Sequence, residues 1–400
     1  MNLELLRELS IPNDSKILLL VIDGLGGLPN DTGRSELEQA NIPHLDRLAQ
    51  ESLCGLTVPV GYGVTPGSGP GHLALFGYDP LEYKVGRGVL EALGIDFDLQ
   101  PADVAARGNF CTVEADSRII DRRAGRIPTD RSAPLCEKLS QIKLPGVQIF
   151  VEPVRDHRFL LVLRGEGLSD RVSETDPQRE GEKPLPVHPL APEAEPTAKL
   201  LNDFVAQAAR LLRDEQPANM LTLRGFAKHP LMPSIAEICK FRPAAIAAYP
   251  MYRGLAKLVG MDVLKTGDGF ADEVETLKAR WAVYDFFFLH FKRADAAGED
   301  GDFQAKMAAL EEVGTYIEEL HALQADVFMI AGDHSTPALM AGHSWHPVPF
   351  MCHAKSFAQA DKIEGFNEKA CSRGILGTFP AKEVLSLAMA YSGRLTKFGA

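Results

Sequence analysis

The sequence predicts an α/β protein with a mainly parallel sheet flanked by helices, plus an inserted smaller α+β domain. Three continuous apolar runs predict buried strands, at residues 16–24 (KILLLVIDG), 281–291 (WAVYDFFFLHF) and 325–337 (ADVFMIAGDHSTP). Runs of this kind are typical of parallel strands that are covered on both faces. Helical segments lie between them in the chain, and strand–helix–strand order favours right-handed crossovers and therefore parallel strands.

Three helices are expected beside these strands. Residues 42–52 (IPHLDRLAQES) have an apolar face at helical spacing, and Pro43 suits a first helical turn. A second helix is expected to begin near Gly71, and residues 303–323 show a longer amphipathic pattern. Helices of this kind would cover the faces of the sheet.

The middle of the chain has a different character. The segments ARGNFCTV, HRFLLVLRG and TAKLLNDFVAQAARLLRDE fit a separate α+β unit, and residues 165–197 are rich in proline, glycine and charge. This last segment is expected to be either a long functional loop or a disordered stretch. We therefore expect a core formed by residues 1–84 and 240–400, interrupted by an inserted domain at 85–239.

Composition limits the classes of partner. The 400 residues carry a formal net charge of −12, which argues against nucleic-acid binding but allows an anionic small molecule in a local basic pocket. No apolar run reaches the ~18 residues of a membrane span, and the N-terminal stretch lacks the pattern of a signal peptide. Six scattered cysteines without a CxxC pair fit reduced thiols. We expect a cytoplasmic protein without a membrane partner.

Acidic side chains follow all three predicted buried strands. Asp23 and Asp333 end two of them and Asp295 follows the third, while His334 and His343 lie close to Asp333 in the chain. In an open α/β sheet the carboxyl ends of the strands form the ligand crevice. Carboxylates gathered there repel one another and are costly to bury unless cations balance them. The pattern predicts a divalent-metal site, with a purely structural cluster as the alternative.

A glycine- and proline-rich turn surrounds a single serine. Residues 63–80 read GVTPGSGPGHLALFGYDP, with Ser68 shortly before an apolar run that begins at Leu73. The segment is either an ordinary loop or a nucleophile placed at the start of a helix, where an anion would bind. A serine hydroxyl becomes a good nucleophile when a metal ion lowers its pKa. We therefore expect Ser68 to lie beside the predicted metal site.

Several short motifs, taken in order, resemble one family. They are VIDGLGG, IPHLDRLA, TPGSGPGHLALFGYDP, GEDGDF with a following lysine-containing helix, AGDHSTP and HSWHPVP. Together they resemble the cofactor-independent (2,3-bisphosphoglycerate-independent) phosphoglycerate mutases of the archaeal type, which belong to the alkaline phosphatase superfamily. The resemblance is strong over roughly 16–95 and 285–350 and weaker in the middle of the chain, at ARGNFCTV, DRRAGRI and HRFLLVLRG.

This resemblance implies a fold and an activity. The fold is an alkaline-phosphatase-like core with an inserted domain that binds substrate and caps the site. The activity is that of an isomerase of glycolysis and gluconeogenesis, which interconverts 2-phosphoglycerate and 3-phosphoglycerate. The phosphoryl group would pass through a phosphoserine at Ser68, the catalytic residue.

The resemblance also implies two divalent metal ions, with manganese expected and magnesium, cobalt or zinc as alternatives. The residues implied for one ion are Asp23, Ser68, Asp333 and His334. Those implied for the other are Asp295, His343 and Glu299. Glu299 departs from the longer mutases of the superfamily, which have a histidine at this position. A carboxylate suits Mn²⁺ or Mg²⁺, and Asp300 or Asp302 could take its place.

A mutase must also hold the glycerate carboxylate and keep water away from the phosphoserine. Arginines of the inserted domain would do both, because arginine binds carboxylates and phosphates with two parallel hydrogen bonds. The full candidate set is Arg118, Arg122, Arg123, Arg126, Arg131, Arg158 and Arg164. We favour Arg122, Arg126, Arg158 and Arg164, although for any single arginine a solvated surface position is the alternative.

The core offers further candidates whose roles the sequence leaves open. Lys257, with Arg253 as its rival, could reach the phosphoryl group or lie on a helix surface. His72 could be a general acid, but a cap or core role is favoured. His346 could lie at the mouth of the site or in an ordinary loop, and His290 is expected to be a core residue.

Two other functions share the same site residues. One is a metal-dependent phosphomonoesterase, or a mutase for another small phosphorylated metabolite, because a fold does not decide the substrate. The other is an inactive homologue that binds metal without turnover. The presence of Ser68 beside the full set of carboxylates and histidines argues against the inactive homologue.

Overall fold

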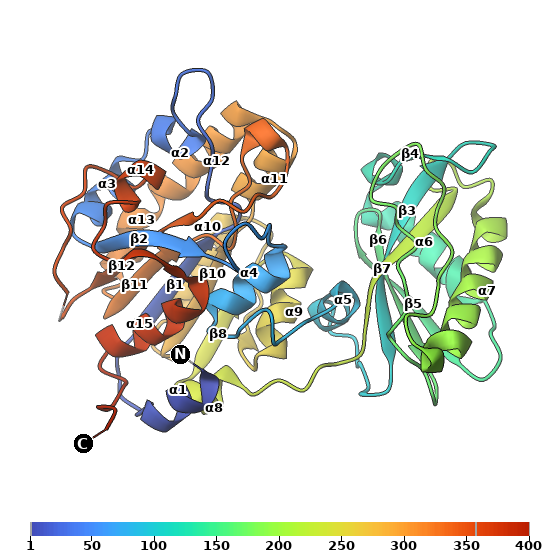
Figure 1. Ribbon diagram of the computed structural model, residues 1–400, viewed down its shortest axis with the longest axis horizontal. Helices are drawn as coiled ribbons and strands as arrows, with labels where there is room; N and C mark the ends of the chain where they lie inside the picture. The colour runs from blue at the N-terminus through green and yellow to red at the C-terminus, as the bar shows by residue number, and fades with distance from the viewer. Residues whose placement is uncertain (1, 357, 400) are drawn as a thin grey trace. The chain divides into compact units, whose positions relative to one another are not determined.

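The computed structural model describes residues 2–356 and 358–399, and the chain divides into two compact units (Figure 1). One unit comprises the chain up to Lys84 and from Met232 onward, and the other is Val85–Leu231. The first division coincides with the boundary expected from the sequence. The second comes at 232 rather than 240, because α8 (Ile235–Cys239) packs within the first unit, where Ile235 N donates to Val259 O over 2.9 Å.

The first unit is built on an eight-stranded sheet in the order β13-β2-β12-β11-β1-β10-β8-β9. Its strands are β1 (Ile17–Ile22), β2 (Leu53–Val58), β8 (Pro243–Ile246), β9 (Asp262–Val263), β10 (Phe286–Phe291), β11 (Val327–Ala331), β12 (Val348–Ala354) and β13 (Gly377–Pro380). All neighbouring pairs are parallel except those of β12, which is antiparallel to β11 and β2. The sheet is therefore mainly parallel, as the apolar runs predicted.

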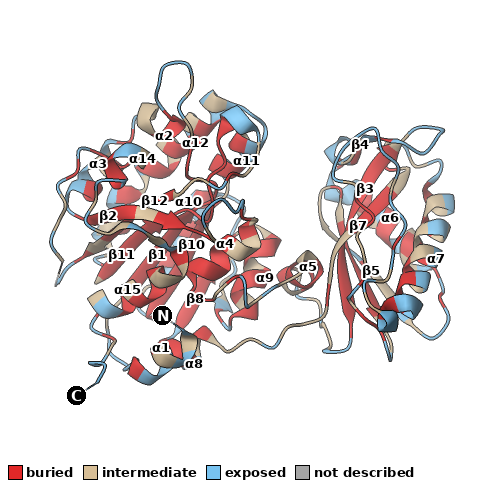
Figure 2. Ribbon diagram, viewed as in Figure 1, coloured by how far each residue is buried: buried red, intermediate tan, exposed pale blue. Residues whose placement is uncertain are grey.

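Helices cover both faces of this sheet. They are α1 (Leu3–Leu9), α2 (Glu36–Gln39), α3 (Pro43–Gln50), α4 (Ser68–Leu75), α8, α9 (Pro250–Leu258), α10 (Phe270–Arg280), α11 (Arg293–Glu299), α12 (Phe303–Thr315), α13 (Ile317–Ala322), α14 (Glu368–Cys371) and α15 (Val384–Tyr391). One core joins Leu18 and Leu20 of β1 to apolar residues of α3, α10, α12 and α13. On the other face, Phe76 at the end of α4 packs edge-on against Phe288 of β10, with ring centroids 4.9 Å apart. Figure 2 shows the strands buried and the helices exposed on their outer sides.

Three predicted elements differ in extent. The strand expected at 281–291 begins only at Phe286, because Trp281 ends α10 and the following residues form a turn in which Val283 N bonds Arg280 O over 3.0 Å. The helix expected at 303–323 is two helices that meet at Tyr316, whose ring packs against Phe270. The strand expected at 325–337 ends at Ala331, so Asp333 and His334 lie in a loop.

The second unit is an antiparallel sheet with helices. Its strands are β3 (Val104–Val113), β4 (Ile119–Asp121), β5 (Gln148–Arg155), β6 (Arg158–Arg164) and β7 (Met220–Ala227), in the order β4-β3-β6-β5 with β7 also paired to β3. Its helices are α5 (Arg87–Gly94), α6 (Thr129–Ser140) and α7 (Glu195–Leu212). The long segment that precedes α7 in the chain runs alongside β7, and Thr175 N in this segment donates to Leu223 O over 2.9 Å.

Of the helices in the described parts of the chain, none has the length and apolar character that a bilayer crossing requires.

Candidate functional site

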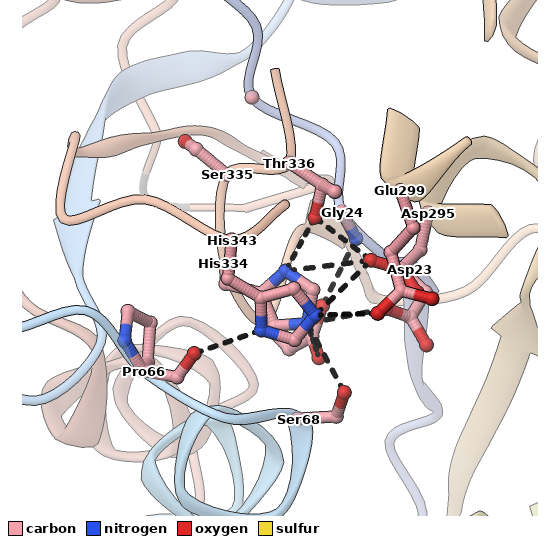
Figure 3. A network of polar contacts seen from close by, with 12 residues as sticks. Asp23, Gly24, Pro66, Ser68, Asp295, Glu299, His334, Ser335, Thr336 and His343 are labelled. Atoms are coloured by element: carbon pink, nitrogen blue, oxygen red, sulfur yellow. Dashed lines mark hydrogen bonds and ion pairs between the residues drawn. The ribbon is translucent and has the colours of Figure 1, made fainter. Parts of the chain in front are cut away.

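The candidate ligands come from the carboxyl ends of three adjacent strands (Figure 3). Asp23 directly follows β1, Asp333 and His334 follow β11, and Asp295 lies in the first turn of α11 after β10. Because β11, β1 and β10 are neighbours and run parallel, their carboxyl ends meet at one edge of the sheet. The topology therefore brings together side chains that are about 300 residues apart in the chain.

Three of these side chains form a fully enclosed cluster, which we call the closed group: Asp23, Asp333 and His334. Their ligand atoms lie within 4.8 Å of one another, and all three residues are 0% exposed. His334 Nε2 lies 3.4 Å from Asp23 Oδ1 and 3.1 Å from Asp333 Oδ2. Ser68, the first residue of α4, places its Oγ 3.1 Å from the same His334 Nε2.

A second cluster lies beside it, and we call it the open group: Asp295, Glu299 and His343. His343 Nε2 lies 3.5 Å from Asp295 Oδ1 and 3.6 Å from Glu299 Oε1. His334 also belongs to this neighbourhood, because its ligand atom lies within 4.8 Å of those of Asp295 and His343. The rings of His334 and His343 are stacked with centroids 3.6 Å apart. The Glu299 side chain is 42% exposed, so this group opens to solvent.

Hydrogen bonds fix which nitrogen of each histidine faces the cluster. The Thr336 hydroxyl donates its hydrogen to Asp295 Oδ1 over 2.8 Å. The Thr336 oxygen must therefore accept in its bond with His334 Nδ1, which is also 2.8 Å long, so His334 Nδ1 carries a hydrogen. His343 Nδ1 donates to the carbonyl of Pro66 over 2.9 Å. Each ring therefore turns Nε2 toward the carboxylates, and for His334 this is a bare lone pair, as metal ligation requires. Thr336 was not predicted as a site residue.

The buried carboxylates fit a bound cation. Asp23 Oδ1 and Asp333 Oδ2 are buried and have no hydrogen-bond partner among the described residues, although both lie close to His334 Nε2 and Asp333 Oδ2 also lies 3.1 Å from His72 Nδ1. Buried polar atoms are almost always satisfied, so these two oxygens fit a missing ligand. Oxygen donors with imidazole nitrogens suit Mn²⁺, Mg²⁺ or Zn²⁺. The residues present therefore fit divalent metal ions.

Three residues that the sequence did not single out for the site surround the outer oxygen of Asp23. Tyr252 of α9 donates its hydroxyl hydrogen to Asp23 Oδ2, and Lys292 Nζ and His290 Nε2 each lie 3.1 Å from the same atom. Lys292 also bonds Asp295 Oδ2, so one ammonium links the two groups. His290 was expected to be a core residue, and its partner proves to be Asp23. Lys292 directly follows β10, so its position after a buried strand could have identified it as a candidate site residue.

The electrostatics of the cluster favour cations. Burial and the neighbouring Asp333 oppose ionisation of Asp23, but Lys292 and the hydrogen bond from His290 hold its pKa well below the usual value. Burial also opposes protonation of His343, yet Glu299 and Asp295 raise its pKa to about 9. A raised imidazole pKa reports a negative local potential. That potential would attract divalent cations.

Close packing explains two glycines near Ser68 and Asp23. A Cβ on Gly71 would lie 2.1 Å from Asp333 O, so only glycine lets α4 pack against the loop that carries Asp333. Gly24 has φ +68, and a Cβ there would lie 2.8 Å from Asp295 Cα. At Gly71 the close approach is therefore between two parts of the protein.

The other core candidates lie outside the two groups. Asp302 caps α12 by accepting from Ala305 N over 2.9 Å. His72 is buried, and its Nδ1 donates to Ser68 O over 2.9 Å and also lies 3.1 Å from Asp333 Oδ2 of the closed group. His346 Nδ1 lies 3.1 Å from Ser344 Oγ, a loop contact. On α9 it is Tyr252 that reaches Asp23, whereas Lys257 is a half-buried residue five positions further on.

The favoured arginines of the second unit do not gather at one place. Arg122 makes two bonds to Asp176, of 3.2 and 2.8 Å. Arg164 makes two to Asp103, of 2.9 and 2.7 Å. Arg158 and Arg164 occupy opposite ends of β6, about 20 Å apart at ~3.3 Å per residue. The structure therefore separates Arg164 from Arg158.

Four arginines, two of them from the favoured set, act on a histidine that the sequence did not single out. Burial, and the charges of Arg158, Arg107, Arg123 and Arg126, lower the pKa of His157 to about 3. Arg107 is buried in β3, and its Nε donates to Asn109 Oδ1 over 3.3 Å. The positive charges that act on His157 include Arg126 and Arg158 of the favoured set, and Arg107 also lies 3.7 Å from Glu91 Oε1.

The fold and the two groups define an α/β protein with a candidate two-metal site beside a serine at the carboxyl edge of a mainly parallel sheet. A family model described as 2,3-bisphosphoglycerate-independent phosphoglycerate mutase matches residues 49–219. A protein of Thermosipho melanesiensis named "Probable 2,3-bisphosphoglycerate-independent phosphoglycerate mutase" is 49% identical over 99% of both chains. A protein of Thermus thermophilus with the same name is 47% identical over 99% of this chain and 98% of its own. The chain belongs to the family of 2,3-bisphosphoglycerate-independent phosphoglycerate mutases.

Two solved structures have the same fold. A protein from Pyrococcus horikoshii superposes with a TM-score of 0.82 at 28% identity, covering 97% of this chain and 100% of its own. The cofactor-independent phosphoglycerate mutase of Thermoplasma acidophilum superposes with a TM-score of 0.65, also at 28% identity, over 95% of this chain and 100% of its own.

Proposed function

We propose that the protein interconverts 2-phosphoglycerate and 3-phosphoglycerate through a phosphoserine at Ser68, without 2,3-bisphosphoglycerate. The family of the chain supports the substrate. One observation supports the route above all others: Ser68 Oγ lies 3.1 Å from Nε2 of His334, the residue that lies close to the ligands of both groups. A nucleophile at this position has the carboxylates and imidazoles of both groups within reach.

Two divalent ions, with manganese favoured, would be held by the two groups. The closed group with Ser68 would hold one ion, and the open group would hold the other, with His334 close to both. When bound, such ions lower the pKa of a coordinated hydroxyl and offset the charge of phosphoryl oxygens. The unsatisfied oxygens of Asp23 and Asp333 support this assignment.

The residues around Ser68 prepare it for attack on phosphorus. Ser68 begins α4, and the His72 Nδ1–H bond to Ser68 O holds the backbone at this point. The N-terminal end of α4 adds backbone amides that favour a phosphoryl anion. In the forward step the Ser68 oxygen bonds to phosphorus and the bond from phosphorus to the glycerate oxygen breaks. The hydroxyl proton of Ser68 ends on that glycerate oxygen, so atoms and charge balance.

The glycerate must then present its other hydroxyl to the phosphoserine. We propose that the basic cluster around His157 in the second unit, with Arg107, Arg126 and Arg158, holds the glycerate carboxylate meanwhile. Guanidinium groups suit this task because they bind carboxylates with two parallel bonds. Under this proposal the second unit is the substrate-binding domain, and covering the site would keep water from the phosphoserine. Lys257 remains a proposed contact of the core with the phosphoryl group.

A coupled assay tests the proposal. In the presence of enolase, a mixture of 3-phosphoglycerate and Mn²⁺-loaded protein should produce phosphoenolpyruvate. Enolase with only one of these two components should produce none. Ser68→Ala should abolish turnover and keep the melting temperature. Ser132→Ala, which removes a buried hydroxyl of α6 bonded to Thr129 O, is the matched control and should keep activity. Inorganic phosphate without isomerised product would favour a phosphomonoesterase, and normal turnover by Ser68→Ala would refute the route.

A further inference from the structure

A fully buried lysine lies behind the site, and none of the roles above uses it. Lys306 is in the first turn of α12 and is 0% exposed. Its ammonium donates to two backbone carbonyls, Gly26 O and Thr336 O, each at 2.8 Å. Glu36 Oε1 lies 4.0 Å away. The two direct partners of this charge are therefore main-chain atoms, both in loops that carry site residues.

The two loops lie next to the ligands of the closed group. Gly26 lies three residues after Asp23 at the end of β1, and Thr336 lies two residues after His334 at the end of β11. Thr336 also uses its hydroxyl to bond His334 and Asp295, as described above. Lys306 thus joins the two loops through their main chain.

Two glutamates, the fully buried Glu36 and the half-buried Glu368, bind amides of the same loops. Glu36 accepts from Leu28 N over 3.2 Å and from Ala338 N over 2.7 Å. Glu368 accepts from Gly27 N over 2.8 Å. The loops therefore have carbonyls held by a cation and amides held by anions. A set of this kind specifies one loop geometry, because each group would be left unsatisfied in another.

This arrangement is unfavourable for stability taken alone. A buried ammonium pays a desolvation penalty, and replacement of buried charges by apolar residues is often stabilising. Lys306 is also placed near the N-terminus of α12, where the helix dipole opposes a positive charge. A residue that serves only packing would not need these features. Its geometry points to a role in holding the loops.

We propose that Lys306 is a positioning residue, which sets the separation of the loops at residues 24–28 and 334–338 so that Asp23 and His334 face one metal ion. The inference rests on the proposed function for the nature of the site. It assigns the positioning of the metal ligands to a side chain that touches neither metal nor substrate. Outer partners of metal ligands typically change metal affinity or activity by about 10- to 100-fold.

The test is Mn²⁺ binding by calorimetry together with the coupled assay. Lys306→Met keeps the length of the side chain and removes the charge and donors. It should weaken Mn²⁺ binding by about 10- to 100-fold. At saturating Mn²⁺ its kcat should fall while KM for 3-phosphoglycerate changes little. Retention of wild-type Mn²⁺ affinity in folded Lys306→Met would overturn the proposal.

The chain offers a matched control at the other end of β1. Arg394 is also 0% exposed, and its guanidinium donates to Asn13 O and Ser15 O, each at 2.8 Å. Arg394→Met should lose thermal stability but keep Mn²⁺ affinity and turnover below its melting temperature. Equal loss of Mn²⁺ affinity in Arg394→Met and Lys306→Met would mean a general stability effect and would contradict the proposal.

A milder variant covers the case in which Lys306→Met does not fold. Glu36→Gln keeps the shape of the side chain and weakens its bonds to Leu28 N and Ala338 N, so it should also weaken Mn²⁺ binding, by a smaller factor. Wild-type Mn²⁺ affinity in this variant would then overturn the proposal.

Failure of the proposed function can be told apart from failure of this inference. Wild-type protein that binds Mn²⁺ without mutase activity would count against the proposed function alone, since the ratio of Mn²⁺ affinities between wild type and variant still decides the role of Lys306. Wild-type protein that binds no Mn²⁺ would overturn both.

Discussion

The closed and open groups differ in how firmly the protein holds them. In the closed group every ligand is 0% exposed, and Asp23 is fixed by Tyr252, His290 and Lys292. In the open group Glu299 is 42% exposed and His343 17% exposed at the side chain. The comparison indicates that the closed group is preorganised for one geometry. In the open group Asp295 is 1% exposed, whereas Glu299 and His343 face solvent.

The largest effect is expected in the closed group. Asp333→Asn removes a buried charge that faces His334, and turnover should fall about 1000-fold, because metal-ion stabilisation of a transition state is worth several kcal/mol. One of two bound Mn²⁺ ions should be lost, as measured by metal analysis of dialysed protein. Asp285→Asn is the control, since Asp285 is a buried carboxylate paired with Arg242 just before β10. It should keep turnover, and an Asp333→Asn protein as active as this control would contradict the comparison.

An intermediate effect is expected for His343. His343→Gln removes one ligand from the open group, while Asp295 and Glu299 remain, so turnover should fall about 100-fold. The weaker of two Mn²⁺ binding steps should weaken further, and the tighter step should be unchanged in calorimetry. Loss of the tighter step instead would show that the open group, not the closed one, holds the stronger site.

A smaller effect is expected for Glu299. Glu299→Gln leaves an oxygen ligand but removes a charge from an exposed position, and turnover should fall about tenfold or less. Titration of activity with Mn²⁺ should move to higher concentration, so that excess metal restores most of the rate. Glu364→Gln, a change at a 93% exposed carboxylate, is the control. A loss as large as that of Asp333→Asn would remove the distinction between the two groups.

Glu273 is a second buried carboxyl group that can be compared with Asp23, because it lacks the cationic partners that Asp23 has. Its Oε1 accepts from Ala248 N over 2.7 Å, and burial raises its pKa to about 8. The folded protein then holds a proton that the unfolded chain releases above its ordinary pKa of 4.5, so stability should fall as the pH rises from about 4.5 to about 8. Glu273→Gln should flatten this part of the melting-temperature profile and leave turnover at neutral pH unchanged. An unaltered profile would mean that Glu273 is ionised in the fold.

Much of the fold and part of the site could be predicted from the sequence for a physical reason. Parallel strands buried on both faces must be apolar throughout, so their ends are visible, and Asp23, Asp333 and His334 stand directly after such ends. Ser68 was visible because glycine and proline mark the turn before α4. These residues owe their positions to local sequence, and the topology brings them together.

The residues that were not predicted depend on packing between distant elements. Tyr252 lies in an ordinary amphipathic helix, and only the placement of α9 turns its hydroxyl toward Asp23. Lys306 is an amphipathic-helix lysine in sequence, where a solvent-exposed position is the usual outcome. Arg164 was predicted to bind substrate as an arginine of the inserted domain, but it bonds Asp103 at the end of β6 opposite to Arg158.

Detection of phosphate on Ser68 tests the central claim most directly. Mn²⁺-loaded protein would be mixed with 3-phosphoglycerate, quenched in acid within milliseconds and digested for mass spectrometry. The account predicts one phosphorylated peptide, which carries the phosphate on Ser68 and is absent from Ser68→Ala. Turnover of 3-phosphoglycerate without phosphate on Ser68 at any quench time, or with phosphate on another residue, would contradict it.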